Sequence, residues 1–254
     1  MRPNARVFNY PPDIILIIAA LAFATGALHG ATGMAGGVVM AAILAHLIGI
    51  KEAVPVMTCA LIFSHGSRVF IYWKDTDWEI VRLVLLFSVP TILLGAYLFT
   101  ILSALVAAIV FAMFLAMSLP IKYWAAQRRI KTNPKLLAGA SMVWGVLAGN
   151  VIGLGFFLAP FLLGTGMNRL AFAGTLAFVT LVMNGLKLVV FGVSSLMTPQ
   201  LLIMGVFIGV ITIPGNWLGS NILHKISDGG HRLVVDILTV GMVLNFIYLA
   251  YSYI

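Results

Sequence analysis

Two apolar stretches of the sequence carry side chains that can bind an anion. The candidates are Thr58, Ser67 and Arg68 in the stretch 58–70, "TCALIFSHGSRVF", and Thr175, Asn184 and Lys187 in the stretch 175–187. Hydroxyl and amide groups donate hydrogen bonds to oxyanions, and the two cations add positive potential. Because polar side chains are costly inside a membrane, their presence there predicts a binding site.

The same side chains also have structural interpretations. A hydroxyl in a membrane helix can bond to the preceding turn of that helix, which applies to Thr58, Ser67 and Thr175. The two cations lie within about two turns of their segment ends, close enough to reach the interface as anchors. The hydrogen-bonding groups of an amide in lipid are less readily satisfied within its own helix than those of a hydroxyl. Asn184 is therefore the strongest candidate.

Two glycine-rich stretches form the second set of candidates. They are "HGATGMAGG" (29–37) and "GNVIGLGF" (149–156), and each separates apolar pieces shorter than the ~20 residues of a membrane span. We therefore predict broken helices at 30–37 and 149–155, where freed N–H groups can line a cavity and bind an anion. Close helix packing is the competing interpretation of such glycines, and it is favoured for 205–219. The predicted site residues are Gly33, Gly36, Gly37, Asn150, Gly153 and Gly155.

Three histidines lie in different apolar segments. The seven acidic residues all lie at or near connectors, so His29 and His65 are the candidate proton carriers if protons drive transport. His29, His46 and His65 also suggest an alternative, a membrane redox component that binds haem or a metal. The sequence contains no CxxCH motif and no HxxxH pair, and we expect no cofactor and no enzymatic activity.

The composition determines which elements position these residues. The chain has 254 residues, of which 62% are hydrophobic and 9% are charged, so we predict an all-α protein that crosses the lipid bilayer several times. Five basic residues lie in 122–135, which predicts a cytoplasmic loop of a plasma (inner) membrane protein and no nucleic-acid partner. The ten apolar segments, eight to ten of which we expect to cross, are 13–29, 37–50, 53–73, 80–101, 103–125, 136–152, 154–166, 170–192, 199–223 and 233–253.

The ten segments fall into two similar sets of five. The stretch "GALHGATGMAGG" (26–37) matches "GVLAGNVIGLGF" (145–156), and "VPTILLG" (89–95) matches "IPGNWLG" (213–219). We predict one membrane domain, 1–254, with repeat one at 13–126, a connector at 127–135 and repeat two at 136–254. An odd number of crossings per repeat would invert the two repeats, as in many secondary transporters.

The glycine motifs resemble those of a known family. The stretches "MAGGVVMAAIL" (34–44) and "IGLGFFLAPFL" (152–162) are similar to the twin glycine motifs of TauE/SafE sulfite-exporter permeases. Pro160 and Leu162 match the second motif, whereas Ala42 replaces the usual proline and Ala35 a glycine of the first. The resemblance implies a permease for sulfite, organosulfonates or related small anions.

These observations together predict a permease for a small anion, most simply a sulfur oxyanion or organosulfonate, that works by alternating access. A passive anion channel is the alternative from a different class. The coupling ion, a proton or sodium, stays open at this point, as do the direction of transport and the oligomeric state.

Overall fold

The computed structural model describes residues 11–32, 35–128, 131–153, 155–223 and 228–254. In these ranges the chain forms ten α-helices, one short 3-10 turn (Trp73–Asp75) and no strand, which confirms the all-α prediction. The helices are α1 (Pro12–Thr32), α2 (Ala35–Ile48), α3 (Ile50–Tyr72), α4 (Trp78–Ile101), α5 (Ala104–Arg128), α6 (Pro134–Asn150), α7 (Gly155–Leu163), α8 (Arg169–Val193), α9 (Pro199–Leu223) and α10 (Asp228–Tyr251). They coincide closely with the ten apolar segments.

Seven of the described helices are long and apolar enough to cross a membrane, namely α1, α3, α4, α5, α8, α9 and α10. The other three are shorter, with 14 residues in α2, 17 in α6 and 9 in α7. Neither α2 nor α7 has the ~20 residues that a full span needs. The eight to ten crossings stay a prediction, because that count includes these shorter helices.

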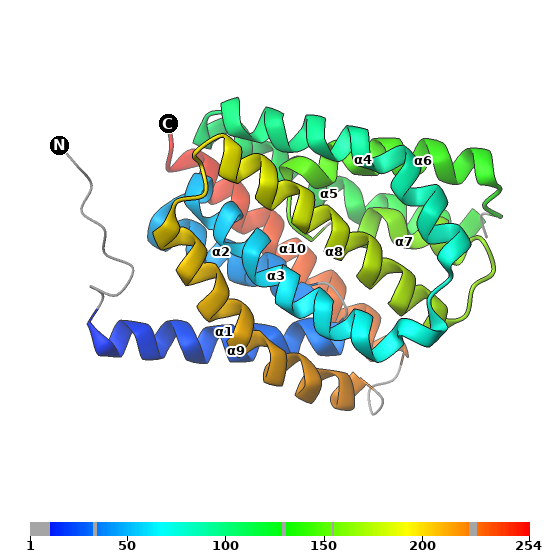
Figure 1. The fold of residues 1–254 in the computed structure, drawn as a ribbon, viewed down its shortest axis with the longest axis horizontal. Coiled ribbons are helices and arrows are strands. Elements are labelled where there is room, and N and C mark those ends of the chain that lie inside the picture. Colours follow the sequence, from blue (N-terminus) through cyan, green and yellow to red (C-terminus); the bar gives the residue numbers. More distant parts are fainter. Residues whose placement is uncertain (1–10, 33–34, 129–130, 154, 224–227) are drawn as a thin grey trace.

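Four helices form two pairs at opposite edges of the bundle, and two further helices lie between these edge pairs. One edge is formed by α1 and α9 and the opposite edge by α4 and α6, while α3 and α8 lie between them (Figure 1). If each of the first five helices is equated with the helix five places later, the α1/α9 pair becomes the α6/α4 pair. The α3/α9 contact likewise becomes α8/α4, and α2/α10 becomes α7/α5. This pairing is what two intertwined repeats would give, although the duplication itself stays a prediction.

Glycines allow the two edge pairs to approach closely. A Cβ atom on Gly30 of α1 would lie 2.1 Å from the backbone oxygen of Asn216 in α9. On the opposite edge, a Cβ atom on Gly149 of α6 would lie 2.3 Å from the backbone nitrogen of Ala96 in α4. Both glycines are inside helices, so their placement in the predicted breaks was wrong. Close helix packing is their correct interpretation.

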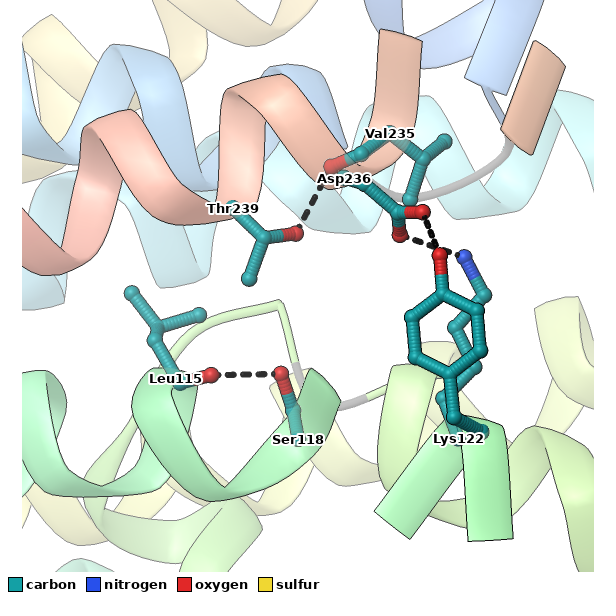
Figure 2. Close-up of polar contacts among 7 residues, drawn as sticks. Leu115, Ser118, Lys122, Val235, Asp236 and Thr239 are labelled. Atoms are coloured by element: carbon teal, nitrogen blue, oxygen red, sulfur yellow. Dashed lines mark hydrogen bonds and ion pairs between the residues drawn. The ribbon is translucent and has the colours of Figure 1, made fainter. Parts of the chain in front are cut away.

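A polar contact joins α5 to α10 (Figure 2). Lys122 of α5 forms an ion pair with Asp236 of α10 at 2.8 Å, and the neighbouring Tyr123 hydroxyl donates a hydrogen bond to the same carboxylate. Further along the same interface, Ser118 and Thr239 donate to carbonyl oxygens of their own helices. This interface therefore contains a charged pair at one end and satisfied hydroxyls beyond it.

Replacement of Gly219 with alanine tests the edge packing. The new Cβ would lie 1.9 Å from the Ala27 backbone oxygen, so we expect Gly219→Ala to lower the free energy of unfolding by about 1–3 kcal/mol. Gly241 of α10 is the matched control, since a Cβ there meets nothing within 4 Å. Thermal unfolding of the purified protein in detergent measures both variants. Equal melting temperatures for the two would contradict the packing account.

Candidate functional site

Both predicted helix breaks are present in the structure. The first lies between Thr32, the last residue of α1, and Ala35, the first of α2, and the Thr32 hydroxyl accepts a hydrogen bond of 3.1 Å from the Ala35 N–H. The second lies between Asn150, which ends α6, and Gly155, which begins α7. Both breaks are narrower than predicted. The candidate Gly33 lies outside the described residues.

The two breaks approach each other at Gly153. This residue has φ of +87°, a left-handed conformation that favours glycine. A Cβ atom on it would lie only 1.9 Å from Cγ2 of Val38, which belongs to α2 beyond the other break. Gly153 is therefore required both by its backbone conformation and by its neighbour.

A small cavity lies where the breaks meet. It encloses about 20 Å³ and is lined by residues of α1, α2 and α3 from the first half and of α6, α7 and α8 from the second. A volume of this size holds about one water molecule, so the structure shows a closed site. The predicted site residues in its wall are His29, Gly37, His65, Gly153 and Gly155. Gly36 packs instead against α1, where its Cβ would lie 2.0 Å from the Thr25 backbone oxygen.

Two buried histidines face each other in the cavity wall. The ring centroids of His29 and His65 are 5.4 Å apart, with an angle of 72° between the planes. Their exposed fractions are 4% and 7%. Within the part of the chain that the structure describes, neither nitrogen of His29 nor Nδ1 of His65 has a hydrogen-bond partner. Such orphaned polar atoms are costly in a protein interior and indicate a functional site.

Lys187 stabilises the second break. Its side chain is completely buried, and Nζ donates a hydrogen bond of 3.1 Å to the carbonyl oxygen of Val151, the residue after α6. The interpretation of Lys187 as an interfacial anchor is therefore wrong. Lys187 itself does not line the cavity; its partner Val151 is the residue before the lining residue Ile152.

The two predicted amide residues bond within their own helices. Nδ2 of Asn150 donates to the Val146 carbonyl at 2.9 Å, and Nδ2 of Asn184 donates to the Thr180 carbonyl at 2.8 Å. Both amides are buried, and among the described residues the Oδ1 atom of each has no partner. Asn150 therefore retains an unused acceptor beside the second break, and Asn184 retains one on α8.

The predicted hydroxyl residues have other contacts. Thr58 donates to the Val54 carbonyl of its own helix, and Thr175 accepts from the Asp77 N–H, which links α8 to the connector before α4. Neither residue lines the cavity. Ser67 donates to the Ser64 carbonyl. The bonds of Thr58 and Ser67 match the structural interpretation, whereas Thr175 bonds to a residue outside its own helix.

The structure also shows two residues that the predicted site lacked. Thr180 lines the cavity, and Asn216 of α9 donates weakly to the Ser64 and Ser67 hydroxyl oxygens at 3.4 Å. Thr180 lies one turn from Asn184 in a stretch already selected for its polar residues. The available signal for Asn216 was an asparagine within the apolar run 199–223, which also contains Asn221.

The histidine redox alternative does not fit this geometry. His46 lies near the end of α2 and is exposed, and its Nε2 bonds with Oδ1 of Asn245 in α10 at 2.9 Å. It is therefore not part of the His29/His65 pair. In the described ranges no group of three or more His, Cys, Asp or Glu side chains is placed to hold a metal ion. His46 therefore does not act together with His29 and His65, as the redox alternative with all three histidines would need.

The family model described as sulfite exporter TauE/SafE matches residues 18–246. No curated protein and no solved structure gives a match.

The contact between the two breaks can be tested by a pair of substitutions. Gly153→Ala should destabilise the protein by about 1–2 kcal/mol through its left-handed backbone, and by more through overlap with Val38. In a Val38→Ala background the overlap is removed, so the cost of Gly153→Ala should fall measurably. Thermal unfolding of the wild type, the two single variants and the double variant gives the coupling free energy between positions 153 and 38. Strictly additive effects would mean that the breaks do not touch.

Proposed function

The chain belongs to the TauE/SafE sulfite exporter family, and on that basis we propose that the cavity between its two helix breaks binds the transported anion. Membership of this family, together with seven apolar helices of spanning length, makes the protein a multi-pass membrane transporter for sulfite-type anions. For the substrate we propose a sulfur oxyanion, sulfite or sulfate, or an organosulfonate. The finer proposals concern how the anion is held and how it moves.

One observation carries the proposed location: two half-helices begin at one cavity. Gly37 lies in the first turn of α2 and Gly155 begins α7, and both line the cavity. The first N–H groups of a helix lack intrahelical partners and attract negative charge. Two such helix ends at one cavity are suited to the oxygens of a small anion.

The charges around the cavity support an anionic ligand. The lining residues include no carboxylate. Lys187 lies beside the second break, and Arg68 is one turn from the lining residue His65. Both cations supply positive potential without having to bind the anion directly. To contact an anion oxygen, Asn150 and Asn184 must use their amide N–H donors, because the atoms without a partner among the described residues are the Oδ1 acceptors.

We further propose that transport uses alternating access. The observed cavity is too small for a sulfur oxyanion, so the protein must rearrange to bind one. The tightly packed edge pairs α1/α9 and α4/α6 form natural rigid units, and both repeats contribute to the cavity between them. Rocking of these units would open the cavity to each side in turn.

For the orientation, we propose a plasma (inner) membrane protein whose segment 122–135 faces the cytoplasm. This segment was predicted as a loop, but it comprises the end of α5, the connector and the start of α6. Its five basic residues support that orientation, because cytoplasmic segments retain Lys and Arg.

The proposed function is tested with purified protein in liposomes. Labelled sulfite should enter in a saturable manner, and sulfate or taurine should compete if the site accepts sulfur oxyanions and sulfonates broadly. Liposomes preloaded with unlabelled sulfite should show counterflow of the label, which an open channel would not. Absence of flux for all three anions would contradict the substrate assignment, and flux without counterflow would favour the channel.

Filling the cavity should block transport without unfolding the protein. Gly37→Ala adds a methyl group to the cavity wall, where its nearest neighbour would be the flexible end of Leu61 at 3.0 Å. We expect a loss of sulfite uptake of about tenfold or more, which corresponds to about 1.4 kcal/mol. Gly241→Ala, on a part of α10 away from the cavity, should leave uptake unchanged. Normal uptake by Gly37→Ala would place the anion elsewhere.

A further inference from the structure

The His29/His65 pair has no role in a site made only of helix N-termini. Both rings lie in the cavity wall, and three of their four nitrogens lack a hydrogen-bond partner among the described residues. A neutral imidazole has one N–H donor and one bare nitrogen that accepts a proton. Neither nitrogen of His29 is occupied, so this ring presents both functions.

The geometry of the pair limits it to one additional charge. The ring centroids are 5.4 Å apart in an edge-to-face arrangement. Two imidazolium ions at this separation would repel each other strongly in a buried site. One proton on either ring avoids that repulsion and leaves the other ring neutral. The pair therefore carries at most one additional proton.

The charged groups around the pair are cationic. Arg68 on α3 interacts electrostatically with both rings, and Lys187 on α8 lies beside the neighbouring break. Helix α9, which packs against both α1 and α3, contains no titratable side chain in 199–223. On the same helix α3, Tyr72 interacts electrostatically with Arg68. On other helices, His46 of α2 bonds with Asn245, and Lys122 and Tyr123 of α5 bond with Asp236. Arg128 near the end of α5 and Arg169 at the start of α8 are the further cations of the packed helices.

These surroundings link the proton to the anion. With the cavity empty, Arg68 repels a further positive charge on the rings. An anion in the cavity attracts that charge, and the protonated ring gains an acceptor for its N–H. Each ligand therefore strengthens the binding of the other, and the coupling is reciprocal by thermodynamic linkage.

We propose that His29 and His65 together take up one proton for each anion that enters the cavity. The proton comes from the solution on the side of entry and binds a bare ring nitrogen. The resulting imidazolium donates an N–H to an anion oxygen. When the anion leaves on the other side, the proton leaves the same nitrogen, so anion and proton are carried together. This inference rests on the proposed function, since it needs an anion in this cavity.

The direct test counts protons released or taken up on binding. Sulfite is titrated into the detergent-solubilised wild-type protein near pH 7 by calorimetry, in buffers of different ionisation enthalpy. Methanesulfonate, which does not titrate near neutral pH, is the second probe, because sulfite changes its own protonation there. We expect about one proton taken up per anion bound, and affinity that rises as the pH falls, by up to about tenfold per pH unit.

Three glutamine variants assign the proton to its residues. His29→Gln and His65→Gln keep a polar side chain of similar reach and cannot carry the proton, so each should reduce proton uptake and flatten the pH dependence. His46→Gln is the matched control, because His46 is exposed and bonded to Asn245 outside the cavity. It should behave as wild type. Thermal unfolding checks that each variant is folded.

The outcomes separate this inference from the proposed function. Anion binding by the wild type without proton uptake would overturn the histidine proposal and leave the anion site intact. Proton uptake that survives in a folded double variant, His29→Gln with His65→Gln, would also overturn it. If the wild type binds neither sulfite nor methanesulfonate and transports neither, the proposed function fails, and the histidine proposal fails with it.

Discussion

The structure depends on one constraint, that a helix interrupted inside a bilayer must find partners for its freed backbone groups. At the first break the Thr32 hydroxyl accepts from the first N–H of α2. At the second, the buried Lys187 ammonium donates to the Val151 carbonyl at the end of α6. Side chains thus satisfy backbone groups at both breaks. In the function that we propose, the remaining N–H groups of α2 and α7 bind the anion.

Close packing at the edges makes this arrangement possible. The glycines of α1 and α9 on one side, and of α4 and α6 on the other, allow backbones to touch and bring the two halves around a shared centre (Figure 1). Gly153 then lies against Val38, and the cavity forms from residues of both halves. The same packing brings α1 close to α3, which places His29 beside His65. Local chain breaks and long-range packing thus produce one site.

Much of this was predictable from local sequence. Hydropathy located all ten helices, and short apolar pieces flanking glycines located both breaks. Local sequence could not separate a glycine that lies in a helix break from one that packs inside a helix. Gly30 lies inside α1 against Asn216, whereas Gly153 lies between α6 and α7 with φ of +87°, against Val38. The partners of Lys187 and Thr175, and the pairing of His29 with His65, likewise depend on tertiary contacts. Predictions for single side chains were accordingly less accurate than those for elements.

The central claim is that the anion binds where the two broken helices meet. The most direct measurement is an anomalous difference map from crystals of the protein grown with selenite, whose selenium replaces the sulfur of sulfite. The account predicts a selenium peak in the cavity between Gly37 and Gly155, with His29 and His65 in its wall and the cavity enlarged from its closed volume. A selenium peak bound elsewhere in the protein, with the cavity still closed, would contradict it.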